Sequence, residues 1–162
     1  MNLMAIGFLL ATAIALLLTP AVGFLATKAG IVDVPRGRHI HKKPVPLIGG
    51  VAIFAAFIVT VLLRLRVTGW VSGLVLGSGI IMLTGIVDDI LELKPLVKLL
   101  GQVVGACVMV GMGVRMEFIS NPLGGMLHMG WLSYPFSVVW ILSFVNAVNF
   151  LDGLDGLASG VV

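Results

Sequence analysis

Residues 67–89 read VTGWVSGLVLGSGIIMLTGIVDD, in which an uncharged, mostly apolar stretch is followed by two adjacent aspartates. A helix needs about 20 mostly apolar residues to cross the hydrocarbon core of a bilayer, and Val67–Val87 meets that length. Four further apolar windows flank this stretch: Leu3–Leu25, Pro46–Leu63, Leu99–Val114 and Trp131–Leu151. The sequence therefore predicts an all-α, polytopic transmembrane protein of about five spans plus the start of a sixth, forming a single membrane domain over residues 1–162.

The composition excludes an ordinary soluble domain. Hydrophobic residues make up 59% of the chain and charged residues only 10%, against about 45–50% and about 25% in soluble proteins. The formal charge of +3 comes without a basic helix or stacking aromatic residues, so no nucleic-acid partner is expected. The single cysteine, Cys107, excludes an intrachain disulfide, and its apolar neighbours predict a buried packing residue.

The charged residues predict an orientation. Threading the chain through the five windows places most of the basic side chains on one side of the membrane: Lys28, Arg36, Arg38, Lys42, Lys43, Lys94 and Lys98. Arg64, Arg66 and Arg115 fall on the other side. Because cytoplasmic loops carry an excess of Lys and Arg, the first side is predicted to be the cytoplasm. Every aspartate and Glu92 also fall on this side, so nearly all acidic side chains face one compartment.

Asp88 and Asp89 form the first candidate site, at the end of the third window. Neighbouring carboxylates repel each other unless a cation lies nearby, and Mg²⁺ is commonly held by one or two carboxylates plus substrate phosphates. A phosphate-handling metal site is therefore one interpretation. The alternative is that both aspartates solvate a loop or anchor a helix end.

A second candidate site lies at the end of the fifth window. Asn146, Asn149, Asp152 and Asp155 recur at intervals of three, which places them along one side of a helix. Their side chains offer donors and acceptors for base, ribose or sugar hydroxyls. An amide ladder that joins helices is an alternative for the two asparagines, although it leaves the two aspartates unexplained.

Basic residues accompany both sites. The loop from Gly30 to Gly50 includes Lys43 and attracts anionic groups, although a topology signal explains any single cation in it equally well. Lys94 and Lys98 follow the aspartate pair, one helical turn apart. Each is either a phosphate ligand or an anchor at the membrane boundary, and the spacing does not decide.

Four motifs occur in order along the chain: His41-Lys-Lys-Pro-Val-Pro-Leu-Ile-Gly-Gly50, Gly85-Ile-Val-Asp88-Asp89, Lys98-Leu-Leu-Gly-Gln102 and Asn146-Ala-Val-Asn149-Phe-Leu-Asp152-Gly-Leu-Asp155-Gly-Leu157. Together they resemble the polyprenyl-phosphate N-acetylhexosamine-1-phosphate transferases, glycosyltransferase family 4. The resemblance implies a larger membrane enzyme in the bacterial cytoplasmic membrane, with this chain as its N-terminal half and the active site facing the cytoplasm. A homodimer is one implied assembly.

The resemblance also implies roles for individual residues. Asp88 and Asp89 are the implied catalytic residues and, with Asp152, the implied ligands of Mg²⁺, for which Mn²⁺ is an alternative. Asp88 would contact or deprotonate the lipid phosphate, and a transient phosphoryl carrier is an alternative role for one of the two aspartates. The implied substrate-binding residues are Asn146, Asn149, Asp152, Asp155, Lys98 and Lys43.

The resemblance is nearest to the branch that transfers N-acetylglucosamine-1-phosphate from UDP-N-acetylglucosamine to undecaprenyl phosphate and releases UMP. The alternatives are the phospho-N-acetylmuramoyl-pentapeptide transferases of peptidoglycan synthesis and an inactive, truncated membrane scaffold. A transporter half is disfavoured, because transporter carboxylates lie near the bilayer midplane and these lie at the predicted edges of spans.

Overall fold

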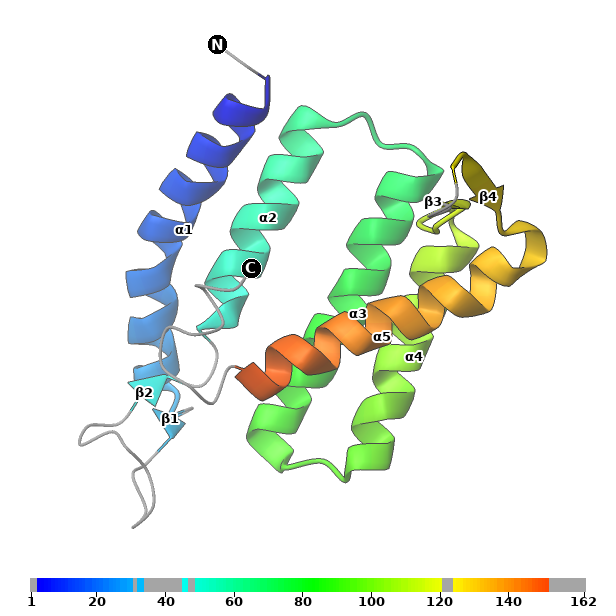
Figure 1. Ribbon diagram of the computed structural model, residues 1–162. Helices are drawn as coiled ribbons and strands as arrows, with labels where there is room; N and C mark the ends of the chain where they lie inside the picture. Colours follow the sequence, from blue (N-terminus) through cyan, green and yellow to red (C-terminus); the bar gives the residue numbers. More distant parts are fainter. Residues whose placement is uncertain (1–2, 31, 34–44, 47–48, 121–123, 152–162) are drawn as a thin grey trace.

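The computed structural model describes residues 3–30, 32–33, 45–46, 49–120 and 124–151 (Figure 1). Over those ranges the chain forms five α-helices: α1 (Leu3–Lys28), α2 (Gly50–Arg64), α3 (Gly69–Leu91), α4 (Pro95–Gly111) and α5 (Ser133–Leu151). Stretches within Met4–Lys28, Gly69–Leu91 and Gly130–Phe150 are long and apolar enough to cross a membrane, and α2 and α4 are shorter apolar helices. The predicted all-α, polytopic membrane fold is confirmed. The predicted start of a sixth span lies outside the described residues.

Two of the predicted windows start about four residues away from the helices that the structure shows. The second helix begins at Gly50 rather than Pro46, because β2 (Val45–Pro46) pairs antiparallel with β1 (Val32–Asp33). The fourth begins at Pro95 rather than Leu99. Proline is favoured in the first turn of a helix, where its missing N–H has no intrahelical partner to lose. This earlier start places Lys98 inside α4.

The helices pack as two antiparallel pairs with a fifth helix laid across one of them. Figure 1 shows α1 beside α2 and α3 beside α4, while α5 crosses the second pair obliquely. A hairpin of β3 (Phe118–Ser120) and β4 (Met126–His128), followed by a short 3₁₀ helix η1 (Gly130–Leu132), joins α4 to α5. The turn between α3 and α4 lies at the opposite end of the pair from this hairpin.

The α3–α4 contact depends on glycines. A Cβ atom added to Gly77 would collide with the Met109 side chain and lie 2.5 Å from the carbonyl oxygen of Gly105. A Cβ on Gly101 would lie 2.5 Å from Oγ1 of Thr84. Small residues spaced four apart let two helix backbones approach closely inside a membrane. On α4, Gly101 and Gly105 therefore pack closely against Thr84, Ile81 and Gly77 of α3.

We expect Gly77→Ala to destabilise the α3–α4 pair by about 1–3 kcal/mol, the usual cost of overpacking a tight contact. Thermal unfolding in detergent measures the effect. Gly79→Ala is the matched control on the same helix, because a Cβ there meets nothing within 4 Å. Equal stability of the two variants would contradict the glycine contact.

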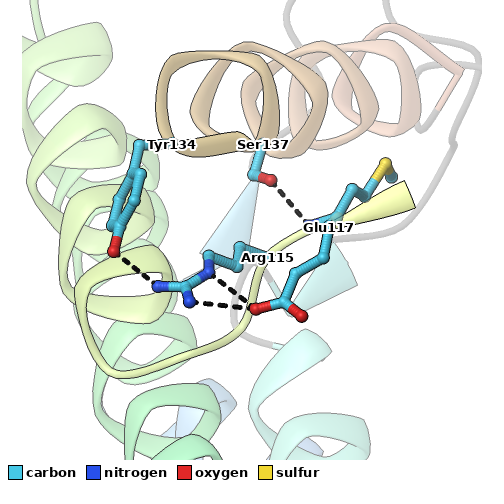
Figure 2. Close-up of polar contacts among 5 residues, drawn as sticks. Arg115, Glu117, Tyr134 and Ser137 are labelled. Carbon is cyan, nitrogen blue, oxygen red and sulfur yellow. Dashed lines mark hydrogen bonds and ion pairs between the residues drawn. The ribbon is translucent and has the colours of Figure 1, made fainter. Parts of the chain in front are cut away.

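A polar cluster fixes the hairpin end of the molecule (Figure 2). Nε and Nη2 of Arg115 donate to Oε1 of Glu117 at 3.1 and 2.9 Å, and Nη1 donates to the Tyr134 hydroxyl at 2.6 Å. The backbone N–H of Met116 donates to Oγ of the buried Ser137 at 2.8 Å. The segment that leaves α4 is thereby tied to the first turns of α5, which sets where α5 begins its crossing.

One packing prediction is wrong. Cys107 is exposed on the surface of the described structure, where it borders an apolar groove between α4 and α5. The apolar neighbours that suggested burial face the outside of a membrane helix equally well, because lipid tails are as apolar as a protein core.

Candidate functional site

The turn between α3 and α4 brings the first two candidate residues together. Asp88 lies in the last turn of α3, and Lys98 lies in the first turn of α4. Between them, Glu92 adopts a left-handed backbone conformation with φ of 48°, and its N–H donates to the carbonyl oxygen of Asp88 at 2.8 Å. This conformation ends α3 and reverses the chain within a few residues, so that both side chains lie at the same end of the pair.

Lys98 joins three helices through its ammonium group. Nζ lies 2.7 Å from Oδ2 of Asp88 on α3 and 3.0 Å from Oδ1 of Asn149 on α5. The side chains of Asp88 and Lys98 are each 19% exposed, so the ion pair is half-buried and still accessible from one side. The pair is electrically neutral and contributes a cationic donor and a carboxylate acceptor to the same small volume.

These residues line a pocket of about 290 Å³ at the end of the bundle. Its polar lining residues are Asp88, Lys98, Asn146 and Asn149, and its apolar lining residues are Leu93, Pro95, Leu99 and Phe150. A small number of polar groups set against apolar surface is the usual composition of a small-molecule site. The arrangement suits an anionic group that contacts Lys98 and a hydroxyl or amide that contacts the carboxylate and amide oxygens.

Asn146 lies one turn further into the bundle than Asn149. Its Nδ2 donates to Oε1 of Gln102 at 2.9 Å and to the carbonyl oxygen of Leu142 at 2.8 Å. The predicted common face of Asn146 and Asn149 is confirmed, because both line the same pocket. The amide-ladder alternative also describes Asn146, since its amide joins α4 to α5.

Asp89 follows Asp88 on α3 but is exposed and lies outside the pocket lining. Consecutive helical residues point about 100° apart, which explains the divergence of the two carboxylates. Among the described residues no group of three His, Cys, Asp or Glu side chains is placed to hold a metal ion. The donor set still fits Mg²⁺, because carboxylate oxygens are its preferred protein ligands and substrate phosphates commonly complete its shell.

Three predicted site residues, Lys43, Asp152 and Asp155, lie outside the described residues. Two residues without a predicted role contact site residues in the structure, although neither lines the pocket. Gln102 was part of a motif without a role of its own, and only the α4–α5 contact shows its partner. Glu92 contacts Asp88 through its backbone N–H alone, and nothing in its residue type indicates its left-handed conformation.

Comparison with known proteins identifies the family. The model of glycosyl transferase family 4 matches residues 71–162. A Bacillus subtilis protein, named as a probable undecaprenyl-phosphate N-acetylglucosaminyl 1-phosphate transferase, is 38% identical and covers 96% of this chain. The decaprenyl-phosphate N-acetylglucosaminephosphotransferase of Mycobacterium tuberculosis is 35% identical over 88% of the chain. The chain therefore belongs to glycosyltransferase family 4.

A third relative is named for the transfer of a different group. The phospho-N-acetylmuramoyl-pentapeptide-transferase of Lactobacillus gasseri is 32% identical and covers 99% of this chain. The matched regions are 44% of the Bacillus protein, 38% of the Mycobacterium protein and 56% of the Lactobacillus protein. The chain thus spans about half the length of the curated relatives that it matches.

Proposed function

We propose that this chain supplies part of the active site of a transferase that moves N-acetylglucosamine-1-phosphate from UDP-N-acetylglucosamine to undecaprenyl phosphate. This reaction would be the first membrane step of a cell-envelope polysaccharide. The observation that carries the proposal is the ammonium of Lys98, held between the Asp88 carboxylate and the Asn149 amide at the wall of a pocket. The names of the Bacillus and Mycobacterium relatives support this choice of reaction.

The reaction is a single displacement at phosphorus. An oxygen of the lipid phosphate attacks the sugar-linked phosphorus of the donor, the bond from that phosphorus to the bridging oxygen breaks, and UMP leaves with that oxygen. Phosphoryl transfer depends mostly on in-line positioning and on neutralising charge. Lys98 would neutralise phosphate charge, Asp88 would orient or deprotonate the lipid phosphate, and Asn149 would hold the nucleoside or sugar side of the donor. A phosphoryl-carrying aspartate remains the alternative for this step.

Mg²⁺, with Mn²⁺ as the alternative, is the proposed cofactor. Asp88 lines the pocket and is the described residue that would hold it there. Asp89, which lies outside the pocket lining, and Asp152 are the other two predicted ligands. When bound, it supplies positive charge to the pyrophosphate oxygens of the donor. The Asp88–Lys98 ion pair is compatible with this role, because the carboxylate keeps a second oxygen besides the one that contacts Nζ.

The proposed site faces the cytoplasm of a bacterial cell. The support is the distribution of charge: the pocket lies at the end of the bundle that holds Lys94 and Lys98, and Arg115 lies at the other end. Cytoplasmic loops carry the excess of Lys and Arg. Nucleotide sugars are cytoplasmic donors, so the orientation and the substrate support each other.

The second candidate function is transfer of phospho-N-acetylmuramoyl-pentapeptide. The Lactobacillus relative favours it, since its match covers nearly the whole chain. The higher identity to the N-acetylglucosamine branch favours the first candidate. An inactive scaffold is a further alternative, and the two experiments below decide between an enzyme and a scaffold. A homodimer is the proposed assembly.

The first prediction concerns activity. Membranes carrying this chain, together with the part of the Bacillus relative that it does not match, should release UMP from UDP-N-acetylglucosamine and undecaprenyl phosphate when Mg²⁺ is supplied. We expect Asp88→Asn to lower the rate by about 10²-fold or more, the usual contribution of a positioned acid or base. Asp152→Asn should also abolish release, and Glu92→Gln is the control, since its side chain has no assigned role.

The intact Bacillus relative, in the same membranes, shows that the assay works. UMP release from the UDP-linked muramoyl-pentapeptide instead would favour the second candidate. If the intact relative is active and the combination of this chain with part of that relative is inactive, the scaffold alternative is supported. The proposed reaction for this chain is then contradicted.

The second prediction concerns the donor. Lys98→Met removes the ammonium and should raise the KM for UDP-N-acetylglucosamine about tenfold or more, because a hydrogen bond to a charged group commonly contributes about 1.5–3 kcal/mol. Lys94→Met is the matched control: Lys94 is exposed just before α4 and does not line the pocket. Equal KM values for the two variants would exclude Lys98 from donor binding.

A further inference from the structure

Two polar contacts cross from α4 to α5 on adjacent helical turns. The outer contact is the bond between Lys98 and Asn149, and the inner contact is the bond between Gln102 and Asn146. Gln102 follows Lys98 by four residues and Asn146 precedes Asn149 by three, so both spacings keep each pair of residues on one helix face. The two contacts are therefore successive rungs at the place where α5 crosses α4.

The rungs differ in burial. Asn149 is exposed, and the Lys98 side chain is 19% exposed, so water and ligands can reach the outer rung. Gln102 is 3% exposed, and the inner rung is a bond between neutral amides. A buried amide that loses its partner carries the full cost of its lost hydration, so the inner rung resists opening. The outer contact, between Lys98 and Asn149, is therefore suited to exchange its partners. The inner contact, between Gln102 and Asn146, is suited to keep its partners.

The hydrogen bonds of Asn146 limit what it can offer to a ligand. Its two Nδ2 protons are committed to Gln102 and to the carbonyl oxygen of Leu142. A primary amide has only two such protons, so Asn146 has none left to donate to a phosphate or a base carbonyl. The amide of Asn146 therefore serves first to bind Gln102 of α4 and the carbonyl oxygen of Leu142 on its own helix.

We propose that Gln102 and Asn146 form a positioning pair that sets the rotation of α5, so that Asn149 and Lys98 meet at the donor pocket. The inference rests on the proposed transferase function, for which it names Gln102 as a positioning residue. It also changes the predicted role of Asn146 from a substrate ligand to a residue that acts through Gln102 and Asn149. The class of ligand affected is the nucleoside diphosphate sugar, not the lipid.

An exchange of the two amides tests the pair. Gln102→Asn shortens one partner by a methylene group and opens the bond, whereas the double variant Gln102→Asn with Asn146→Gln restores the summed length. In the transferase assay we expect each single variant to lower kcat/KM for UDP-N-acetylglucosamine about tenfold, with the KM for undecaprenyl phosphate unchanged. The double variant should recover to within about threefold of the wild type.

The alternatives give different patterns. If Asn146 contacts the donor directly, the double variant will remain as impaired as Asn146→Gln. If the pair only joins helices, the single variants will lose thermal stability and show unchanged kcat/KM below their unfolding temperature. Either result overturns the positioning role.

A second measurement does not need turnover. Hydrogen exchange of the backbone amides in residues 142–151, measured on the chain in membranes, should accelerate in Gln102→Asn and return to the wild-type rate in the double variant. Unchanged exchange in Gln102→Asn would overturn the inference even in an active enzyme. If the wild type is inactive as a transferase but its variants show this exchange pattern, the proposed function is contradicted. The coupling of α4 to α5 is still supported in that case.

Discussion

The close approach of α3 and α4 is the constraint on which the candidate site depends. Gly77 and Gly105 face each other where neither backbone leaves room for a Cβ atom, and Gly101 lies directly against the side chain of Thr84. These contacts fix the antiparallel register of the two helices. Given that register, the turn after α3 places Asp88 opposite Lys98. The ion pair follows from packing that begins one helical turn away, at Gly101 and Thr84, and continues to Gly77.

The charged groups of the described structure lie near the two ends of the helices. Asp88 and Lys98 stand at one end, and Arg115, Glu117 and Tyr134 form the cluster at the other. Charge near the middle of a bilayer is costly, whereas charge at the ends of spans can reach water or head groups. Between the ends, the polar contact of α4 with α5 is the neutral bond from Asn146 to Gln102. This division lets α5 be held at its first turns and at Asn146 while the pocket stays accessible.

Most large apolar side chains of the described residues face outward, as on Phe8, Leu63, Leu83 and Phe150. Few side chains are fully buried, and those are small, with Val71 the largest. In water such a surface would drive aggregation. In a membrane it is the expected exterior, and helix association then relies on close packing and hydrogen bonds rather than on hydrophobic burial. This balance explains why glycines and amides, rather than large core residues, define the arrangement.

The sequence by itself determined the membrane class, the number and approximate places of the five helices, and the grouping of Asp88, Lys98 and Asn149 at one end of the spans. It did so because span length, hydropathy and charge distribution are local properties. The partners within the site were decided by tertiary structure. Nothing local indicates that Lys98 bridges Asp88 and Asn149 or that Gln102 holds Asn146, because hydrogen-bond partners on different helices depend on register and rotation. Those are set by the glycine contact of α3 with α4 and by the crossing of α5.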